Sequence, residues 1–405
     1  MVEPDSPQNL VPSSSSASPG EQPIPIRSLK ELIDQVSGRG VRPTEMEVDS
    51  GQAELLPFPF LAIVGQREMK LALLLSLANP AVGGVLLIGP RGTGKTTGVR
   101  SLVDLLPQVL RSLCYYGCMP EDIETGGIDA VCPDCARKYA NSEPLAAMDR
   151  VRLVELPLNA RLEDVVGGLD ERSTVHERLR FRRGILAQAD RNLLYIDEVN
   201  LLTDEVVDAI LDAAAQGSFT VRRGPLSATY RSRFVLVGSM NPEEGRLRPQ
   251  IMDRFGLRVL VPGLKGDAAS EERLEAYRRV RAYLTNPRRV VNQYASETAM
   301  VREEIQAARE ILPEVILPEQ VARQGLNLIA ELQIDSLRAE ITLFEAARAY
   351  AAIDARQEVS PDDLREVAPM ALRLRRSTFM TEYLANQATE EQHLGSLIDK
   401  TLQKD

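Results

Sequence analysis

The sequence predicts an α/β fold, in which a mostly parallel sheet covered by helices precedes a smaller all-α domain. Short apolar runs alternate with helical patterns between about residues 57 and 261, as is typical of parallel sheets. A glycine-rich phosphate-binding motif follows the first clear apolar run. After about residue 270 the strand patterns stop and only helical periodicity continues.

The expected strands are the short apolar runs, because a parallel sheet buries both faces of its strands. They cover residues 84–88, 151–156, 192–196, 234–239 and 258–261. Helices are expected in the α/β part at residues 66–78, 96–105 and 205–215. The helical part is expected to contain residues 271–283, 297–311, 318–332, 338–355 and 361–374 as helices.

The phosphate-binding motif lies between the first strand and its helix. It fits G-x-x-x-x-G-K-[ST] with Gly89, Pro90, Arg91, Gly92, Thr93, Gly94, Lys95 and Thr96. Its backbone N–H groups would face phosphate oxygens at the positive end of the helix, which continues with Thr97. Lys95 would reach the β- and γ-phosphates and Thr96 would bind Mg²⁺. The sequence therefore predicts an ATP and Mg²⁺ site.

A second apolar strand ends in two carboxylates. Residues 193–196 lead into Asp197 and Glu198. Asp197 would hold Mg²⁺, and Glu198 would orient and deprotonate the attacking water. Two adjacent acids could also form a solvated helix start, but the phosphate motif about 100 residues upstream favours the catalytic interpretation.

Three further residues are candidates for sensing or stabilising the γ-phosphate. Asn241 follows the apolar strand 234–239 and would position the water, although an Asn before a Pro is also a common turn. Arg254 could stabilise transition-state charge as a finger from a neighbouring subunit, or merely pair with Asp253. Arg338 opens a helix and could reach back to the γ-phosphate, or be an ordinary helix-start arginine.

The composition excludes several classes of function. The chain has 405 residues, a net charge of −10, no Trp and only 4% aromatic residues. The negative net charge has the wrong sign for bulk attraction to nucleic acid. The low aromatic content supplies few side chains on which bases could stack. No apolar run approaches about 18 residues, so no membrane span is expected. With no apolar signal core at the N-terminus, the cytoplasm is the expected location.

The motifs together resemble the magnesium chelatase subunit I family. The resemblance covers roughly residues 57 to 380 and keeps its order throughout. It is carried by Phe-Pro-Phe-Leu-Ala-Ile-Val-Gly-Gln at 58–66, Met-Lys-Leu-Ala-Leu-Leu-Leu at 69–75, Tyr-Ile-Asp-Glu-Val-Asn-Leu-Leu at 195–202, Asn-Pro-Glu-Glu-Gly at 241–245, and residues 247–256.

The resemblance implies an AAA+ ATPase that forms homo-hexameric rings. Such a subunit works with a larger one that pairs an AAA+ domain with a von Willebrand A domain. Together they drive a porphyrin-binding subunit that inserts Mg²⁺ into protoporphyrin IX, a ligase reaction of chlorophyll and bacteriochlorophyll biosynthesis. It also implies that Asn241 is sensor 1, Arg254 the trans-acting finger and Arg338 sensor 2. Val64, Gly65 and Gln66 would lie beside the adenine, and residues 219–227 would form the hairpin before sensor 1.

Domain boundaries follow from these assignments. We expect a disordered leader at 1–55, an AAA+ core at 56–265, a linker with a helix at 266–295, a helical lid carrying sensor 2 at 296–385 and a tail at 386–405. The leader is rich in Ser, Pro, Glu and Gln, which disfavours a packed core. The segment 157–184 matches the family loosely, and where many relatives read Phe-Glu-Pro-Gly this chain has Phe-Arg-Arg-Gly at 181–184.

All four cysteines fall in one insertion of the core, at about residues 112–140. Cys114 and Cys118 form one close pair, and Cys132 and Cys135 form the other. Two such pairs can place four thiolates around a structural Zn²⁺. The main alternative is a redox-switched disulfide. Such a closed site would brace the insertion and leave no position for catalysis.

Two other functions stay open at this stage. A cobaltochelatase-type ATPase would use the same motor with a different metal, and a chaperone-like AAA+ ATPase would activate a von Willebrand A partner without any tetrapyrrole. The residues of the motor do not separate these, because metal specificity resides in the partner subunit.

Overall fold

The computed structural model describes residues 56–106, 108–114, 117–169, 181–223, 226–245, 247–264 and 269–376. All of them belong to one compact unit, Leu56–Asp405. The expected leader at 1–55 and tail at 386–405 lie outside the described residues. The domain boundaries inside the unit stay predictions.

Five parallel strands form the central sheet, in the order β11-β1-β10-β7-β4. Their bounds are β1 Val85–Ile88, β4 Leu153–Leu156, β7 Leu193–Ile196, β10 Val235–Met240 and β11 Leu257–Leu260. Each overlaps one of the strands predicted from the apolar runs, so the predicted α/β fold is confirmed. Since all five strands run the same way, their carboxyl ends meet at one edge.

Alternate side chains of each strand enter two separate hydrophobic cores. Val85 and Leu87 of β1 belong to the first core, together with Tyr195 of β7. Leu86 and Ile88 belong to the second. Residues two apart in a strand share a face, so this alternation shows that helices cover both faces of the sheet.

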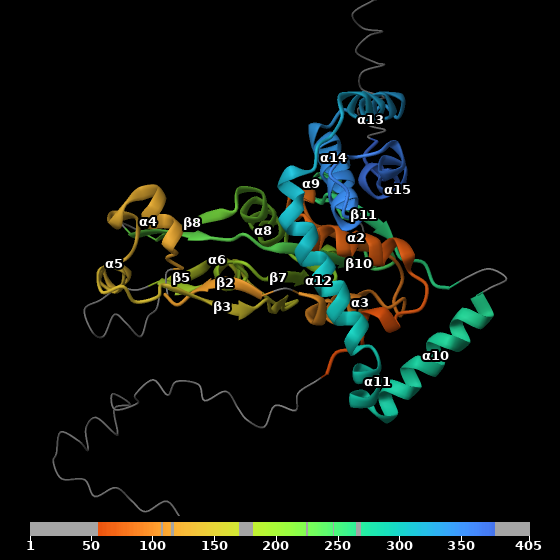
Figure 1. The fold of residues 1–405 in the computed structure, drawn as a ribbon, viewed down its shortest axis with the longest axis horizontal. Helices are drawn as coiled ribbons and strands as arrows, with labels where there is room; N and C mark the ends of the chain where they lie inside the picture. Colours follow the sequence, from red (N-terminus) through yellow and green to blue (C-terminus); the bar gives the residue numbers. More distant parts are fainter. Residues whose placement is uncertain are drawn as a thin grey trace, which may run out of the picture. The chain divides into compact units, whose positions relative to one another are not determined.

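The first face is covered by helices from both ends of the unit. They are α2 (Arg67–Ala78), α3 (Lys95–Arg100), α12 (Ala295–Ile311), α14 (Leu337–Ile353) and α15 (Pro361–Leu372). Figure 1 shows α12 and α14 beside α2, which agrees with the shared core. The helical lid is therefore packed onto the sheet layer through a continuous apolar core.

The second face is covered by shorter helices. They are α6 (Leu162–Val166), α7 (Ile185–Gln188), α8 (Asp204–Gln216) and α9 (Pro249–Arg254). The remaining α-helices outside the cysteine insertion are α10 (Ala269–Thr285), α11 (Pro287–Gln293) and α13 (Glu319–Glu331). Short 3₁₀ turns occupy Phe60–Ala62, Pro80–Val82, Ile128–Ala130, Val199–Leu201 and Leu312–Glu314.

The helix after the phosphate motif is shorter than predicted. It was expected over residues 96–105, but α3 ends at Arg100 and a 3₁₀ helix follows at Ser101–Leu105. Ser101 Oγ donates to the carbonyls of Thr97 and Gly98, 2.7 and 3.0 Å away. Such back-bonding competes with regular α-helical hydrogen bonds and accounts for the change.

Three small antiparallel ribbons lie outside the central sheet. β2 (Gln108–Ser112) pairs with β3 (Ala146–Arg150), β5 (Gly167–Leu169) with β6 (Phe181–Arg183), and β8 (Ser218–Arg223) with β9 (Leu226–Arg231). The third is the hairpin expected over residues 219–227, and the residues between its strands, 224–225, lie outside the described residues. The first two ribbons were not predicted.

The cysteine insertion consists of the β2–β3 ribbon and the two short helices between its strands, α4 (Pro120–Gly126) and α5 (Pro133–Ala140). Figure 1 shows α4 close to β8, in agreement with the pairing of Asp122 in α4 with Arg231 in β9. We call residues 108–114 and 117–150 the cysteine module.

Among the helices that the structure describes, none combines the length and the apolar character that a membrane crossing requires. The cytoplasmic location stays a prediction.

Candidate active site

The phosphate motif forms the turn between β1 and α3. Gly94 is the residue before the helix and has φ 88°, a left-handed conformation that favours glycine. Gly89 is constrained differently, because a Cβ there would lie 2.2 Å from the carbonyl oxygen of Val261. The first glycine thus allows close strand packing, and the later one allows the chain to turn into the helix.

Lys95 lies across this turn. Its Nζ donates to the carbonyls of Gly89 and Pro90, at 2.6 and 2.8 Å. Burial lowers the pKa of Lys95, while the charges of Asp197 and Glu198 oppose that shift. The ammonium group is therefore held by the same loop that would wrap a phosphate.

A cleft of about 240 Å³ opens above the motif at the carboxyl edge of the sheet. Its lining comprises Arg91, Gly92, Thr93, Gly94, Lys95, Thr96, Thr97, Asp197, Glu198 and Asn241. Thus the carboxylates and Asn241, predicted from two different strands, meet the phosphate motif in one place. Gly89 and Pro90 contribute carbonyls that hold Lys95.

Two candidate Mg²⁺ ligands face one another in this cleft. Thr96 Oγ1 lies 3.4 Å from Asp197 Oδ2. A hydroxyl and a carboxylate are hard oxygen ligands of the kind that Mg²⁺ takes in addition to waters and phosphates. The donor set therefore fits the Mg²⁺ of MgATP.

Two hydroxyls behind these ligands were missed by the sequence analysis. Tyr195 Oη lies 2.8 Å from Asp197 Oδ1, 3.2 Å from Thr96 Oγ1 and 3.2 Å from Ser239 Oγ. Ser239 Oγ donates to Asp197 Oδ1 at 2.5 Å. Both residues are buried, and they fix the orientation of the Asp197 carboxylate.

Glu198 has an unusual backbone. Its φ is 53°, in the left-handed region that is costly for a residue with a Cβ. Its N–H donates to Ser239 Oγ at 3.2 Å. This turn directs the chain away from the strand directly after Asp197, so the two adjacent acids take different positions at the edge of the sheet.

The Glu198 carboxylate has a charged neighbour that was not predicted as a site residue. Glu244 accepts from Asn241 Nδ2 at 2.7 Å and pairs with Arg91 Nε at 2.5 Å. Arg91 also lies 3.8 Å from Glu198. Burial and then the charge of Glu244 raise the pKa of Glu198, while Arg91 opposes the rise.

A larger apolar cleft of about 660 Å³ adjoins the phosphate motif. Ile63, Val64 and Gln66 line it together with Phe58 and Leu264. Gln66 Nε2 donates to the carbonyl of Pro262 at 2.9 Å, which ties this segment to the end of the sheet. Gly65 makes the turn between Val64 and Gln66, with φ 64°. A flat apolar base fits such a cleft.

Arg254 and Arg338 are not brought into the cleft of their own chain. Arg254 pairs with Asp212 and Asp208 of α8, at 2.8 and 3.3 Å. Arg338 pairs with Asp253 at 3.2 Å, directly beside Arg254. Arg254, the last residue of α9, thus faces α8, whereas Arg338 of α14 contacts α9 through the Asp253 carboxylate.

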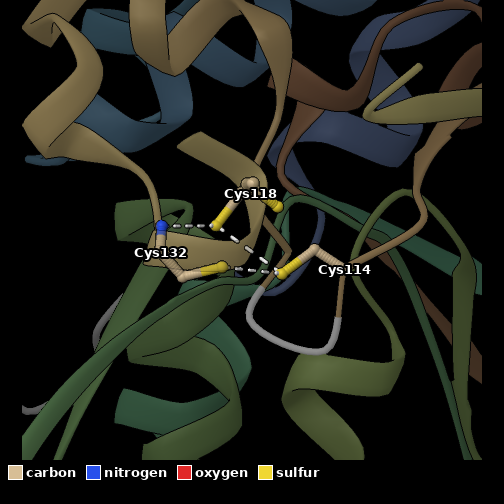
Figure 2. Close-up of side chains that lie close together, drawn as sticks. Cys114, Cys118 and Cys132 are labelled. Carbon is tan, nitrogen blue, oxygen red and sulfur yellow. Dashed lines mark hydrogen bonds between the residues drawn. The ribbon is translucent and has the colours of Figure 1, made fainter. Parts of the chain in front are cut away.

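The four cysteines converge in the cysteine module. Their sulfur atoms all lie within 4.8 Å of one another. Cys114 Sγ is 3.7 Å from Cys118 Sγ and 3.5 Å from Cys132 Sγ, and Figure 2 shows these side chains pointing toward one another. Cys118 and Cys135 are buried.

Comparison with known proteins assigns the chain to a family. The AAA domain profile matches residues 82–239 and the AAA lid domain profile matches residues 325–395. The magnesium-chelatase 38 kDa subunit of Acidiphilium rubrum is 43% identical over 337 residues, which cover 82% of this chain and 95% of that protein. The chain belongs to the magnesium chelatase subunit I family.

Two further members and one solved structure illustrate the range of the family. A magnesium-chelatase subunit ChlI homolog of Methanocaldococcus jannaschii is 40% identical, with 82% of this chain and 90% of that protein covered. The chloroplastic subunit ChlI-2 of Arabidopsis thaliana is also 40% identical, over 81% of this chain and 78% of that protein. A chain from a structure of the complex between subunits BchI and BchD of magnesium chelatase is 40% identical, with a TM-score of 0.45, covering 81% of this chain and 99% of that one.

Proposed function

We propose that this chain is the ATPase motor subunit of a magnesium chelatase, which hydrolyses ATP to drive Mg²⁺ insertion into protoporphyrin IX by partner subunits. One observation carries the proposal. The hydrolytic side chains surround a single cleft in a chain that spans nearly the full length of a magnesium-chelatase subunit at 43% identity.

The phosphate-binding loop and five side chains of the cleft receive roles in this proposal. The backbone of 89–94 and Lys95 bind the phosphates, Thr96 and Asp197 hold Mg²⁺, Glu198 accepts the proton of the attacking water, and Asn241 orients that water. Bound Mg²⁺ supplies positive charge to the β- and γ-phosphate oxygens. Val64, Gly65 and Gln66 border the apolar cleft that would receive the adenine.

The arginines complete the site from a neighbouring subunit in a homo-hexameric ring. Arg254 and Arg338 both lie beside α9 and outside the lining of the 240 Å³ cleft of their own chain. Guanidinium groups placed on an exposed side of one subunit can reach the γ-phosphate held by the next. We therefore assign both arginines to the neighbour's cleft.

The partners we propose are an AAA+/von Willebrand A chelatase subunit and a porphyrin-binding large subunit. The similar chain comes from a structure of the complex between subunits BchI and BchD of magnesium chelatase. No nucleic acid is included among the partners, since the net charge of −10 opposes it.

Reconstitution tests the metal and the substrate together. The purified chain, the two partner subunits, ATP, protoporphyrin IX and either Mg²⁺ or Co²⁺ are combined, and metalloporphyrin formation is followed by fluorescence. We expect ATP-dependent Mg²⁺ insertion. In a parallel reaction a corrin precursor replaces protoporphyrin IX, and Co²⁺ insertion in that reaction alone would instead indicate a cobaltochelatase. ATPase stimulation by a von Willebrand A protein without any metal insertion would indicate a chaperone.

We also propose that the four cysteines hold a structural Zn²⁺. Four sulfurs at about 2.3 Å from a tetrahedral zinc ion lie roughly 3.8 Å apart. Two of the sulfur–sulfur separations, 3.5 and 3.7 Å, are close to that value, and all four sulfurs lie within 4.8 Å of one another. Mass spectrometry of the native protein should find one zinc per chain. A metal-free protein whose thiols react freely with a thiol reagent would contradict this assignment.

A further inference from the structure

Helix α4 of the cysteine module contacts the catalytic core through two acidic side chains. Asp122 of α4 pairs with Arg231, the last residue of β9. Glu121, the preceding residue, lies 3.4 Å from Arg191 and 4.0 Å from Arg231. The side chains of Arg191, Arg231 and Asp122 are at most one quarter exposed. Partial burial makes such pairs stronger than those on an open surface.

These arginines mark the starts of two central strands. Arg191 lies two residues before β7, which ends beside Asp197 and Glu198. Arg231 is followed after Ser232, Arg233 and Phe234 by β10, which ends beside Asn241. The backbone N–H of Arg191 also donates to the carbonyl of Arg233 at 2.6 Å. The module thus contacts the end of the sheet opposite to the ATP cleft.

A third contact comes from the segment that departs from the family pattern. Arg183 Nη2 donates to the carbonyl oxygen of Cys114, 3.3 Å away. Arg191 Nη1 donates to the carbonyl of Leu110 in β2 at 3.0 Å. Arg183, the second arginine of the Phe-Arg-Arg-Gly segment, therefore binds the backbone of a cysteine in the proposed metal site.

The module itself has little apolar core to hold this surface in place. Its buried apolar cluster consists of Cys118, Val131, Cys135 and Leu145. A cluster of this size cannot offset the entropy of ordering two short helices, so such modules are usually stabilised by a metal or by disulfides. The position of α4 would then depend on what the cysteines bind.

We infer that the zinc-loaded cysteine module is a brace for the β8–β9 hairpin and the starts of β7 and β10, which it contacts through Asp122 and Glu121. Arg183 of β6 adds a contact to the backbone of Cys114. This inference rests on the zinc proposed above and adds its purpose. Bound zinc would fix the position of α4, whose acidic side chains pair with Arg191 and Arg231. The strands that begin near these arginines, β7 and β10, end beside the proposed catalytic carboxylates and Asn241. Loss of the metal is expected to loosen the hairpin first.

Hydrogen–deuterium exchange of the full chain tests the brace directly. We compare the zinc-loaded protein with the same protein after treatment with a zinc chelator. Amides of Ser218–Arg223 and Leu226–Arg231 should exchange at least about tenfold faster without zinc, while those of α14 should not change. Equal exchange in the hairpin with and without zinc, or a native protein with no zinc, would overturn the inference.

A double-mutant cycle tests the Asp122–Arg231 ion pair separately from zinc binding. Asp122→Asn and Arg231→Gln should each speed hairpin exchange several-fold with one zinc per chain retained, and the double variant should add little to either. Glu124→Gln, which changes an exposed carboxylate on the same helix, is the matched control and should change nothing. Additive effects in the double variant would contradict a role for the Asp122–Arg231 ion pair in holding the hairpin. ATP hydrolysis and reconstituted metal insertion report separately on the proposed function.

Discussion

Tyr195 Oη lies 2.8 Å from Asp197 Oδ1, two residues further along the chain and directly after the end of β7. Alternate residues of a strand share a face, so the tyrosine reaches the carboxylate from within the first hydrophobic core. Its hydroxyl is also 3.2 Å from Thr96 Oγ1. One buried phenol thus connects both proposed Mg²⁺ ligands.

Tyr195→Phe should weaken Mg²⁺ use more than ATP binding. Without the hydroxyl, Asp197 and Thr96 lose a shared partner, and such losses typically reduce metal affinity or activity by about 10-fold or more. Titrating ATPase activity with Mg²⁺ should show a higher half-saturating concentration, with nucleotide binding nearly unchanged. Tyr139→Phe, at an exposed tyrosine of α5, is the control. Identical Mg²⁺ curves for the two variants would contradict the role of Tyr195.

Glu198→Gln should bind ATP and fail to hydrolyse it. Glutamine keeps the shape of the side chain but cannot accept the proton of water, and losing a general base typically costs about 10²–10⁴-fold in rate. Single-turnover hydrolysis and a fluorescent-nucleotide binding assay measure the two properties separately. Glu205→Gln on α8 serves as the control. Retained turnover in Glu198→Gln would remove Glu198 as the base.

Glu244→Gln should shift the pH dependence of hydrolysis. The charge of Glu244 raises the pKa of Glu198, after the larger effect of burial. A base works only when ionised, so a raised pKa makes activity fall earlier as the pH is lowered. Removing the Glu244 charge lowers the pKa of Glu198 and should move the acid limb of the kcat profile to lower pH. An unmoved or raised acid limb would contradict the coupling, and Glu243→Gln, at the exposed neighbouring acid, is the comparison.

Mixed rings test whether Arg254 acts on a neighbour. Arg254→Ala and Lys95→Ala should each abolish hydrolysis alone. Random mixing at equal amounts should restore about a quarter of the interfaces, where an intact cleft meets an intact finger. Mixing Arg338→Ala with Lys95→Ala should restore about the same fraction of the interfaces. Absence of rescue would indicate a role in cis, and Arg323→Ala on α13 should remain fully active.

Asp363→Ala should destabilise the helical lid. The buried Asp363 carboxylate accepts from Arg356 at 2.6 and 2.9 Å and from Ser360 N at 2.7 Å. We expect a loss of about 2 kcal/mol in the free energy of unfolding, since Arg356 is partly exposed. Burial alone would raise the pKa of Asp363, but these bonds lower it. The stabilisation is therefore present above the unfolded-state pKa and lost as the pH falls through the folded one. Thermal unfolding at several pH values measures it, with Asp362→Ala as the exposed control.

The strands and motif residues were predictable because their signals are local. A strand buried on both faces, such as β10, must be an apolar run, and the glycine motif must adjoin one. The convergence of Asp197 and Asn241 with the phosphate motif followed from the parallel order alone.

The residues that were missed depend on contacts between distant segments. Tyr195 and Ser239 read as ordinary members of apolar strands. The pairing of β7 with β10 brings the Ser239 hydroxyl to Asp197 and to the Tyr195 hydroxyl. The β2–β3 ribbon is largely solvent-accessible, so its sequence lacks the apolar pattern of a core strand. The position of Arg338 against Asp253 depends on how the lid packs, which the sequence of a helix start does not encode.

Because Glu198 has a left-handed backbone, stability and catalysis favour different residues at this position. A side chain with a Cβ in that conformation costs on the order of 1 kcal/mol, which glycine would not incur. The chain therefore retains a locally unfavourable residue at the position where it needs a carboxylate. A laboratory selection for heat-tolerant variants would therefore favour Glu198→Gly, which gives a more stable protein that no longer hydrolyses ATP.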